Sequence, residues 1–415
     1  MTTDNGLNSS ILQSEPAKTR PLKIDVVVHG RFHAFHLARA LLARGHDLRL
    51  LTNYPKFAAE RFGIPREHVR SFTLHGLASR LHAKTLGRLE LSQGQPALHM
   101  LFGRWAANTI RRDADIVYIF SGIAEEALNA LDEATRAKIW LVRGSSHIRT
   151  QHKLLQQEEA RAGVRIDKPT AWSIAREERE YARARLIVTL STFSHASFQE
   201  HAELSHKAVL LVSAVDASRF RPDPGVVAER CRRIRNGDPL RVLNVGAFSF
   251  RKGARDLVDV AAHFAGRETG KMEFRFVGDM PAETRTLRQR AAGLIDLLPR
   301  VPEFELVQHY AWADVFVFPT IEDGFPAVVA QAQASGLVVV TTPNGSGPDL
   351  IMASETGWLV PIRSPGSFIE KLEFCDANRD VLAEMTSVAY NSYVPRDWSS
   401  MAQDLEREHT VAALS

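Results

Sequence analysis

The stretch over residues 321–351, IEDGFPAVVAQAQASGLVVVTTPNGSGPDLI, predicts a loop, a helix, a strand and a second loop in that order. It follows the apolar run VFVF at 315–318, which is typical of a short buried strand. Asp323 is a candidate cap for a helix over 327–334, and Gly336 suits the position just after the end of that helix. The stretch is therefore a repeating unit of a parallel α/β sheet.

Loops that follow parallel strands gather at the carboxyl edge of the sheet, where open α/β folds bind ligands. We therefore expect Glu322, Asp323, Phe325 and the loop 344–347 to line a site.

The size and composition of the chain fit two soluble domains. A chain of 415 residues is too long for one ordinary core, and its 45% hydrophobic and 24% charged residues are typical of globular proteins. No apolar run approaches the roughly 20 residues that cross a bilayer, and the N-terminus lacks a secretory core segment. The only cysteines, Cys231 and Cys375, exclude a disulfide scaffold and a cysteine metal site. We expect a cytoplasmic protein.

Basic residues concentrate in the first half of the chain. Residues 1–200 hold 29 Lys and Arg against 20 Asp and Glu, whereas residues 201–415 hold 23 against 28. The segment 56–112 alone has 10 basic and 3 acidic residues among spaced leucines. This pattern fits amphipathic helices in peripheral contact with an anionic inner membrane face, and it fits core helices with basic outer faces equally well.

Alternating strands and helices occur in two successive sets, which predicts two doubly wound domains facing each other across a cleft. The expected organisation, taken in chain order, is a disordered tail at 1–20, a first domain at 21–213, a linker at 214–239, a second domain at 240–390 and a terminal segment at 391–415. Trp398, Met401 and Leu405 in that last segment predict a helix that returns to the first domain.

Four stretches together resemble a known family. They are DGFPAVVAQAQASG at 323–336, NVGAFSFRKG at 244–253, FVGD at 276–279 and SAVDASRFRP at 213–222. They are similar to motifs of the retaining glycosyltransferases of the GT-B fold, in particular the glycogen-synthase-like group often called family 4. The resemblance implies a nucleotide-diphosphate sugar as donor, a glycan or lipid-linked acceptor, retention of configuration, no obligatory metal and no nucleic-acid partner.

Arg251 and Lys252 are the candidate groups for the donor diphosphate. They precede Gly253 at an expected helix start, which places two cations and backbone amides where phosphates bind. The resemblance also gives His147, at the end of a first-domain strand, the position of an active-site histidine that contacts the donor sugar. It assigns the loop glycines Gly30, Gly246 and Gly278, together with Arg31, to the surroundings of the donor.

The motif of the opening stretch departs from the family at two positions. The family has glutamates where this chain has Asp323 and Gln331. Between them lie Gly324, Phe325 and Pro326, which we expect to contact the donor. Asp323 keeps a carboxylate with a shorter reach, and the adjacent Glu322 can substitute for it. Gln331 can accept from a ribose hydroxyl without charge, or it can be a buried amide.

These departures leave other functions open. One alternative is a nucleotide-sugar epimerase or hydrolase on the same fold, and another is a degenerate pair of domains that binds nucleotide sugar without turnover. Two further patterns are discounted. Asp113-Ala114-Asp115 precedes a strand and so lies at the wrong sheet edge for a metal-binding motif, and His29, His33 and His36 lack an obvious further zinc ligand.

Overall fold

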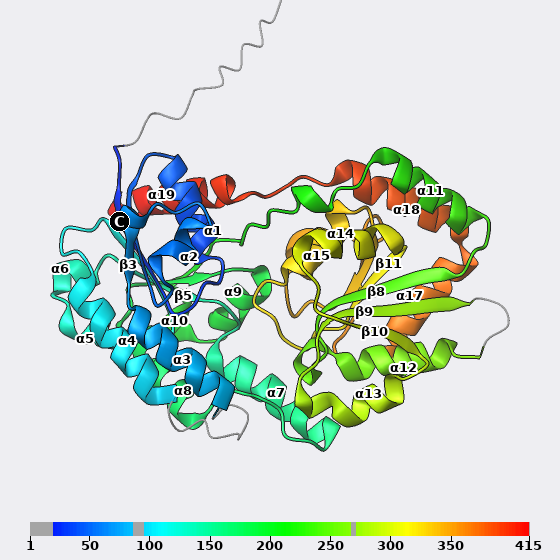
Figure 1. Cartoon of the computed structure of the whole chain (residues 1–415), viewed down its shortest axis with the longest axis horizontal. Helices are drawn as coiled ribbons and strands as arrows, with labels where there is room; N and C mark the ends of the chain where they lie inside the picture. Colours follow the sequence, from blue (N-terminus) through cyan, green and yellow to red (C-terminus); the bar gives the residue numbers. More distant parts are fainter. Residues whose placement is uncertain (1–19, 86–94, 267–270, 415) are drawn as a thin grey trace, which may run out of the picture.

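A computed structural model describes residues 20–85, 95–266 and 271–414 as two α/β domains that lie side by side (Figure 1). Residues 1–19 of the predicted tail lie outside the described residues. These described residues form two parallel sheets, one in each domain. The GT-B arrangement expected from the sequence, two facing Rossmann-like domains, is confirmed.

The first sheet has seven strands in the order β3-β2-β1-β4-β5-β6-β7. Their bounds are β1 (Lys23–Val28), β2 (Asp47–Thr52), β3 (Val69–Ser71), β4 (Ile116–Phe120), β5 (Ile139–Arg143), β6 (Leu186–Thr189) and β7 (Ala208–Leu210). The order reverses beside β1, so the loops after β1 and β4 diverge at the carboxyl edge and leave room for a ligand.

The second sheet has six strands in the order β10-β9-β8-β11-β12-β13. Their bounds are β8 (Leu240–Ala247), β9 (Met272–Asp279), β10 (Ile295–Pro299), β11 (Val315–Phe318), β12 (Val338–Thr341) and β13 (Gly357–Leu359). The order reverses between β8 and β11, so the loops that follow these two strands meet at the equivalent switch point of the second domain.

Helices connect the strands in both domains. Those of the first domain are α1 (Ala34–Ala43), α2 (Lys56–Glu60), α3 (Thr73–Thr85), α4 (Gln95–Thr109), α5 (Glu125–Ala130), α6 (Glu133–Arg136), α7 (Ile148–Ala162), α8 (Ala171–Arg183), α9 (Thr192–Gln199) and α10 (Ala202–Ser205). Those that follow are α11 (Pro224–Arg235), α12 (Ala254–Phe264), α13 (Arg285–Ala291), α14 (Glu303–Trp312), α15 (Ala327–Ala334), α16 (Gly347–Leu350), α17 (Pro365–Ala377), α18 (Arg379–Ser392) and α19 (Trp398–Leu414).

Strand β11 shows why the second sheet is covered on both faces. Successive side chains of a strand point to opposite faces. Val315 and Val317 join a cluster with residues of α12, α17 and α18, whereas Phe316 and Phe318 join a second cluster with residues of α14 and α15. All four side chains are buried, as expected for a central parallel strand between two helical layers.

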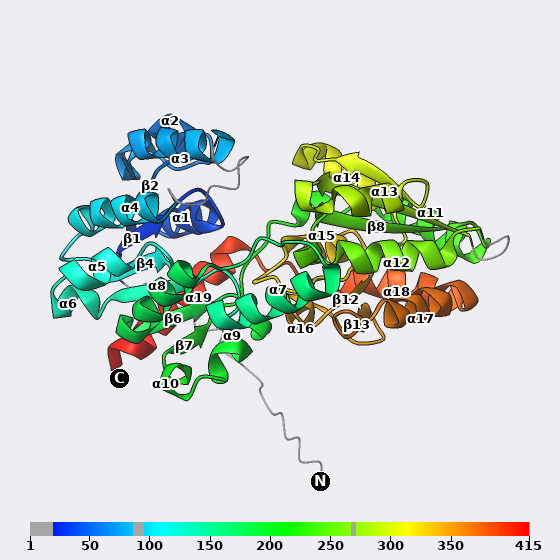
Figure 2. The same ribbon diagram turned by 90° about the horizontal axis from the view of Figure 1, so that it is seen from below.

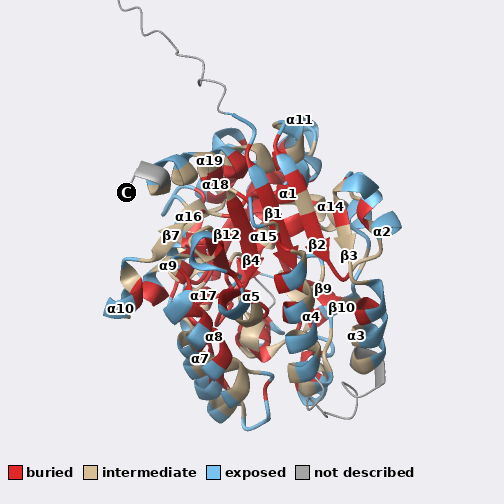
Figure 3. Ribbon diagram, turned by 90° about the vertical axis from the view of Figure 1, so that its left-hand side faces the viewer, coloured by how far each residue is buried: buried red, intermediate tan, exposed pale blue. Residues whose placement is uncertain are grey.

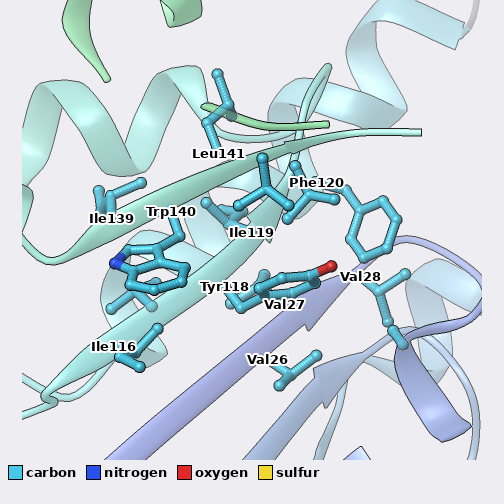
Figure 4. Close-up of a cluster of buried hydrophobic side chains, with 14 of the residues drawn as sticks. Val26, Val27, Val28, Ile116, Tyr118, Ile119, Phe120, Ile139, Trp140 and Leu141 are labelled. Carbon is cyan, nitrogen blue, oxygen red and sulfur yellow. The ribbon is translucent and has the colours of Figure 1, made fainter. Parts of the chain in front are cut away.

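The core of the first domain is built from the same kind of strand. Val26, Tyr118 and Trp140 come from neighbouring strands and pack in one cluster, in which all three are at most 3% exposed (Figure 4). Burial follows the strands in the middle of the molecule, while the helices keep exposed outer faces (Figure 3).

Helix α19 returns to the first domain, as the sequence predicts. It lies along α1 (Figure 1), and its residues Met401, Ala402 and Leu405 are fully buried in the first-domain core. At its start, Trp398 stacks on His36 with ring centroids 5.3 Å apart. The chain therefore crosses between the domains a second time after α18.

The predicted linker at 214–239 is more ordered than expected, because it contains α11. Pro224 stands at the start of this helix, where its missing N–H costs nothing. Val227, Cys231 and Ile234 then pack into the second-domain core, and α11 lies against α18. Strands β3, β10 and β13 lie at the edges of the two sheets.

No helix among the described residues combines the length and the apolar character needed to cross a membrane.

The packing of α19 can be tested on one helix. Leu405→Ala removes a fully buried side chain, so we expect a loss of about 2–5 kcal/mol in the free energy of unfolding of the first domain. Val411→Ala on the same helix is the control, because Val411 is 56% exposed. Urea unfolding followed by circular dichroism measures both. Equal unfolding midpoints for the two variants would contradict the packing.

Candidate active site

The candidate site lies where the carboxyl edges of the two sheets meet. Helix α7 reaches from the first domain to the short 3-10 turn η5 (Phe250–Lys252), and α9 lies against α16 (Figure 2). The loop after β11 and the loop after β5 therefore face each other across the junction.

Gly253 fixes η5 against the end of β11. Its φ is +74°, and a Cβ atom there would lie 1.9 Å from the carbonyl oxygen of Pro319, so a side chain does not fit. The amide of Ile321 donates to the carbonyl of Arg251 at 2.9 Å. The two segments that the sequence singled out are thus joined through backbone contacts.

Three backbone amides of this turn already have acceptors within the turn. The amides of Lys252, Gly253 and Ala254 donate to the carbonyls of Ser249 and Phe250 at 3.0–3.1 Å. A phosphate at this point would therefore be met chiefly by the side chains of Arg251 and Lys252.

Two ion pairs bring four of the predicted site residues together. Arg251 Nη2 lies 2.8 Å from Glu322 Oε2, and Lys252 Nζ contacts Asp323 Oδ2. Burial lowers the pKa of Lys252, and the neighbouring Asp323 opposes that effect. Asp323 is therefore not the predicted helix cap, since Pro326 occupies the capping position of α15 and the carboxylate is held by Lys252.

Glu322 is fully buried and ionised. Burial alone would raise the pKa of its carboxyl group, but Arg251, the hydroxyl of Ser145, Lys252 and the amide of Ser146 outweigh burial and bring the pKa to about 2. Two of these partners, Ser145 and Ser146, belong to the loop after β5 in the first domain. The sequence shows polar and small residues at the end of this strand. It does not show that they contact Glu322.

Gly324 lies at the contact between the domains. A Cβ atom there would lie 2.1 Å from the carbonyl oxygen of Gly144. Phe325, the next residue, packs against both the first-domain cluster and a second-domain cluster. Ser346 Oγ donates a hydrogen bond to the carbonyl of Pro326 at 3.2 Å, which joins the opening motif to the loop 344–347.

Gln331 is partly exposed on α15. Its Oε1 accepts a hydrogen bond from the hydroxyl of Tyr310 at 3.0 Å. Because Tyr310 is fully buried, this bond orients the amide group of Gln331. The family's ribose-binding role for this position stays a prediction.

The backbone conformation favours glycine at both Gly246 and Gly278. Their φ angles are +148° and +153°, and a Cβ atom on Gly278 would lie 1.7 Å from the carbonyl oxygen of Gly246. Strands β8 and β9 therefore approach closely at their carboxyl ends, beside the loop that carries Arg251.

Gly30 and Arg31 lie in the first-domain loop after β1, apart from the ion pairs. Gly30 has φ +97°, and its amide donates to Asn53 Oδ1 at 2.8 Å. The guanidinium of Arg31 lies over the ring of Phe62, 4.6 Å from the centroid. Arg31 therefore makes a first-domain contact in this structure.

His147 is 1% exposed, and its ring packs within the first domain. The ring stacks on His201 with centroids 3.9 Å apart and contacts Tyr181 and Phe198. It also borders a cavity of about 360 Å³ that α8 and α10 line. The structure therefore groups His147 with these rings rather than with Arg251 and Lys252, and its predicted contact with a donor sugar stays a prediction.

The discounted patterns have structural partners. Asp115 accepts from Arg20 and from the amide of Lys23, ahead of β4. His33 and His36 stack on Trp398, whereas His29 lies beside His75 and His99. In the parts of the chain that the structure describes, no group of three His, Cys, Asp or Glu residues is arranged to hold a metal ion.

This geometry defines a class of protein. Two Rossmann-like domains with facing carboxyl edges and a terminal helix that crosses back constitute the GT-B fold. Residues 239–376, a third of the chain, match the family model described as glycosyl transferases group 1.

Solved structures of similar fold cover nearly the whole chain. Anabaena HepE in complex with UDP and glucose aligns with a TM-score of 0.66 over 94% of this chain and 100% of its own, at 15% identity. WaaG, a glycosyltransferase involved in lipopolysaccharide biosynthesis, aligns with a TM-score of 0.58 over 93% and 99%, at 16% identity. These likenesses establish the fold.

Curated relatives are more similar in sequence over a shorter span. The GDP-mannose-dependent alpha-(1-6)-phosphatidylinositol monomannoside mannosyltransferase of Mycobacterium tuberculosis is 26% identical over 51% of this chain and 58% of its own length. The D-inositol 3-phosphate glycosyltransferase of Geodermatophilus obscurus is 27% identical over 64% and 61%. The chain thus spans less than two thirds of each relative.

The burial of His147 predicts acid sensitivity. Burial lowers its pKa to about 3, and the nearby His201, Arg143 and Arg149 act in the same direction. In the unfolded chain the pKa is about 6.5, so below that pH the unfolded state binds a proton that the folded state does not. The free energy of unfolding should therefore fall by about 1.4 kcal/mol per pH unit on this account as the pH drops from about 6.5 toward 3.

His147→Asn provides the comparison. Asparagine can keep the capping contact with the amide of Arg149 but does not titrate. Urea unfolding at several pH values should give a shallower pH dependence for the variant, whatever its absolute stability. Parallel curves for the two proteins would assign the acid sensitivity to other groups.

Proposed function

We propose that this protein is a glycosyltransferase that moves a sugar from a nucleotide-diphosphate sugar to a glycan or lipid-linked acceptor. The observation that carries the proposal is the cluster of Arg251, Lys252, Glu322 and Asp323 at the switch point of the second domain. The match of residues 239–376 to glycosyl transferases group 1 supports it.

The chemistry of this cluster suits a leaving diphosphate. As the bond between sugar and phosphate breaks, negative charge develops on the leaving phosphate oxygens. Arg251 and Lys252 would stabilise that charge, and each is already held in place by a carboxylate. Two fixed cations of this kind can serve without an obligatory metal. Asp323, which pairs with Lys252, would accept a hydrogen bond from a hydroxyl of the donor sugar.

Retention of configuration, transfer of a hexose and a place in family 4 are parts of the proposal that rest on the motif resemblance. A role in envelope polysaccharide or glycolipid synthesis is supported by relatives such as the putative colanic acid biosynthesis glycosyltransferase WcaL of Escherichia coli, 25% identical over 56% of this chain and 58% of its own length.

Turnover of a panel of UDP-, GDP- and ADP-sugars with a membrane lipid extract tests the function. We expect release of the nucleoside diphosphate that depends on the extract, together with a new glycoside whose anomeric configuration matches that of the donor. Conversion or hydrolysis of the donor without an acceptor would favour an epimerase or hydrolase. Binding of a donor without any turnover would favour a degenerate binding protein.

Lys252→Ala tests the role of the cations. If Lys252 stabilises the leaving diphosphate, turnover should fall by roughly 10²-fold or more. Lys371→Ala is the control, because Lys371 lies on α17 and pairs with its neighbour Glu370. Steady-state kinetics with the best donor of the panel measure both, and unchanged kinetics for Lys252→Ala would refute the role.

Peripheral binding to an anionic membrane face is a further part of the proposal. Leu74 and Leu77 lie on α3 and are 77% and 58% exposed, while His75 between them is buried. Helix α3 thus presents apolar side chains outward in a segment of strongly basic composition. Apolar side chains on such a basic surface suit insertion between anionic headgroups.

Vesicle sedimentation tests this contact. The double variant Leu74→Ser and Leu77→Ser should bind vesicles of phosphatidylcholine with about one third phosphatidylglycerol roughly tenfold less tightly. It lacks two leucine side chains that would be buried among the lipids on binding. Phe304→Ser is the control, since Phe304 is 73% exposed on the second domain. If the double variant and the control variant bind the vesicles equally tightly, α3 is not the membrane contact.

A further inference from the structure

Glu322 belongs to the second domain, yet most of its hydrogen-bond donors belong to the first. Its Oε1 accepts from Ser145 Oγ at 2.5 Å, from Ser146 Oγ at 2.9 Å and from the amide of Ser146 at 3.1 Å. Its Oε2 accepts from Gln151 Nε2 at 3.1 Å and from Arg251 Nε at 2.9 Å. The carboxylate is fully buried between the domains.

Arg251 is held from both sides of the junction. Its guanidinium donates to Glu322 Oε2, and its Nη2 also donates to Ser145 Oγ at 3.1 Å. The Arg251 side chain is 34% exposed, so part of the guanidinium faces solvent while these two contacts fix its plane. Its orientation therefore depends on a loop of the other domain.

The backbones of the two loops touch at the same place. Gly324 leaves no room for a Cβ atom, because such an atom would lie 2.1 Å from the carbonyl oxygen of Gly144 and 2.9 Å from Ser145 Cα. The serine hydroxyls reach the Glu322 carboxylate only while this close approach holds. A side chain at position 324 would keep the loops apart.

We propose that the first-domain loop 144–146 acts through Glu322 as a positioning element for Arg251, so that closure of the two domains completes the diphosphate-binding site. Glu322, Ser145 and Ser146 are positioning residues in this arrangement. In an open molecule, Arg251 would lose its contact with Ser145. The carboxylate of Glu322 would then be exposed to water. The inference rests on the proposed function for what Arg251 binds.

Another bridge between the domains offers a control. Asp349 on α16 accepts from Thr192 Oγ1 at 2.6 Å and from the amide of Thr192 at 3.1 Å, at the start of α9. These contacts join the same two domains but involve neither Arg251 nor Glu322. Thr192→Val removes the hydroxyl contact of this bridge, keeps its amide contact and leaves the side chains that hold Arg251 in place.

The first measurement is affinity for UDP and GDP by titration calorimetry. Ser146→Ala should weaken binding by about fivefold and Glu322→Gln by about tenfold or more, because each loses a hydrogen bond to a charged group that fixes Arg251. Thr192→Val should stay within about twofold of the unaltered protein. If Ser146→Ala also stays within twofold, or Thr192→Val weakens binding as much, the inference is overturned.

A double-mutant cycle separates positioning from a general structural effect. In an Arg251→Lys background the guanidinium that Ser145 and Glu322 orient is gone, so Ser146→Ala should change nucleotide affinity by less than about twofold. If Ser146→Ala weakens nucleotide binding by the same factor in the unaltered protein and in the Arg251→Lys variant, Ser146 does not act through Arg251.

If the protein binds no nucleotide, the proposed function is refuted. The closure of the two domains can still be tested by a measurement that needs no ligand. Fluorescence transfer between labels on Ala78→Cys and Glu303→Cys reports the separation of the domains, since the native Cys231 and Cys375 are buried. Gly324→Ala and Glu322→Gln should lengthen that separation. An unchanged separation in both variants would overturn the proposed closure.

Discussion

The buried carboxylate of Glu322 sets the relation between the two domains. A buried charge is tolerated only when it is paired and its oxygens are hydrogen-bonded. Here Arg251 supplies the opposite charge, and two serines and Gln151 supply the remaining donors from the other domain. Separation of the domains would exchange these donors for water, so the junction depends on how well this one group is satisfied.

The polar contacts continue into the first domain behind the loop. Arg143 donates to the Oε1 of Gln151 at 2.7 Å and to the carbonyl of Ser146 at 2.9 Å, and it pairs with Glu177 at 3.1 Å. Arg143 is buried, so these partners are needed to hold its charge. Strand β5 and helices α7 and α8 are thereby fixed beneath the loop that meets Glu322.

Much of the fold was predictable because its signals are local. The run 315–318 is apolar at every position, and such a run is typical of a strand covered on both faces. Helix α11 was missed because its segment is rich in proline and charge, although Pro224 occupies a helix start, where proline is favoured. Asp323 was misread as a cap because its partner Lys252 lies 71 positions away.

The candidate site was predictable in composition but not in its contacts. The motifs name Arg251, Lys252 and Asp323. In the structure Lys252 pairs with Asp323, and Arg251 pairs with the adjacent Glu322. Nothing local in the sequence links Glu322 to Ser145, which lies 177 positions earlier. Such a pair becomes visible only when two domains are placed together.

The departure at Asp323 also has a physical setting. An aspartate side chain is one methylene shorter than the glutamate of the family, and here Lys252 contacts it directly while Glu322 pairs with the neighbouring Arg251. Each cation thus has its own carboxylate, and the four charges cancel in the absence of a ligand. A diphosphate that approached this cluster would have to share both cations with carboxylates already in place. The affinity for such a diphosphate would depend on how rigidly those carboxylates hold the cations, and for Arg251 it would also depend on the loop of the first domain.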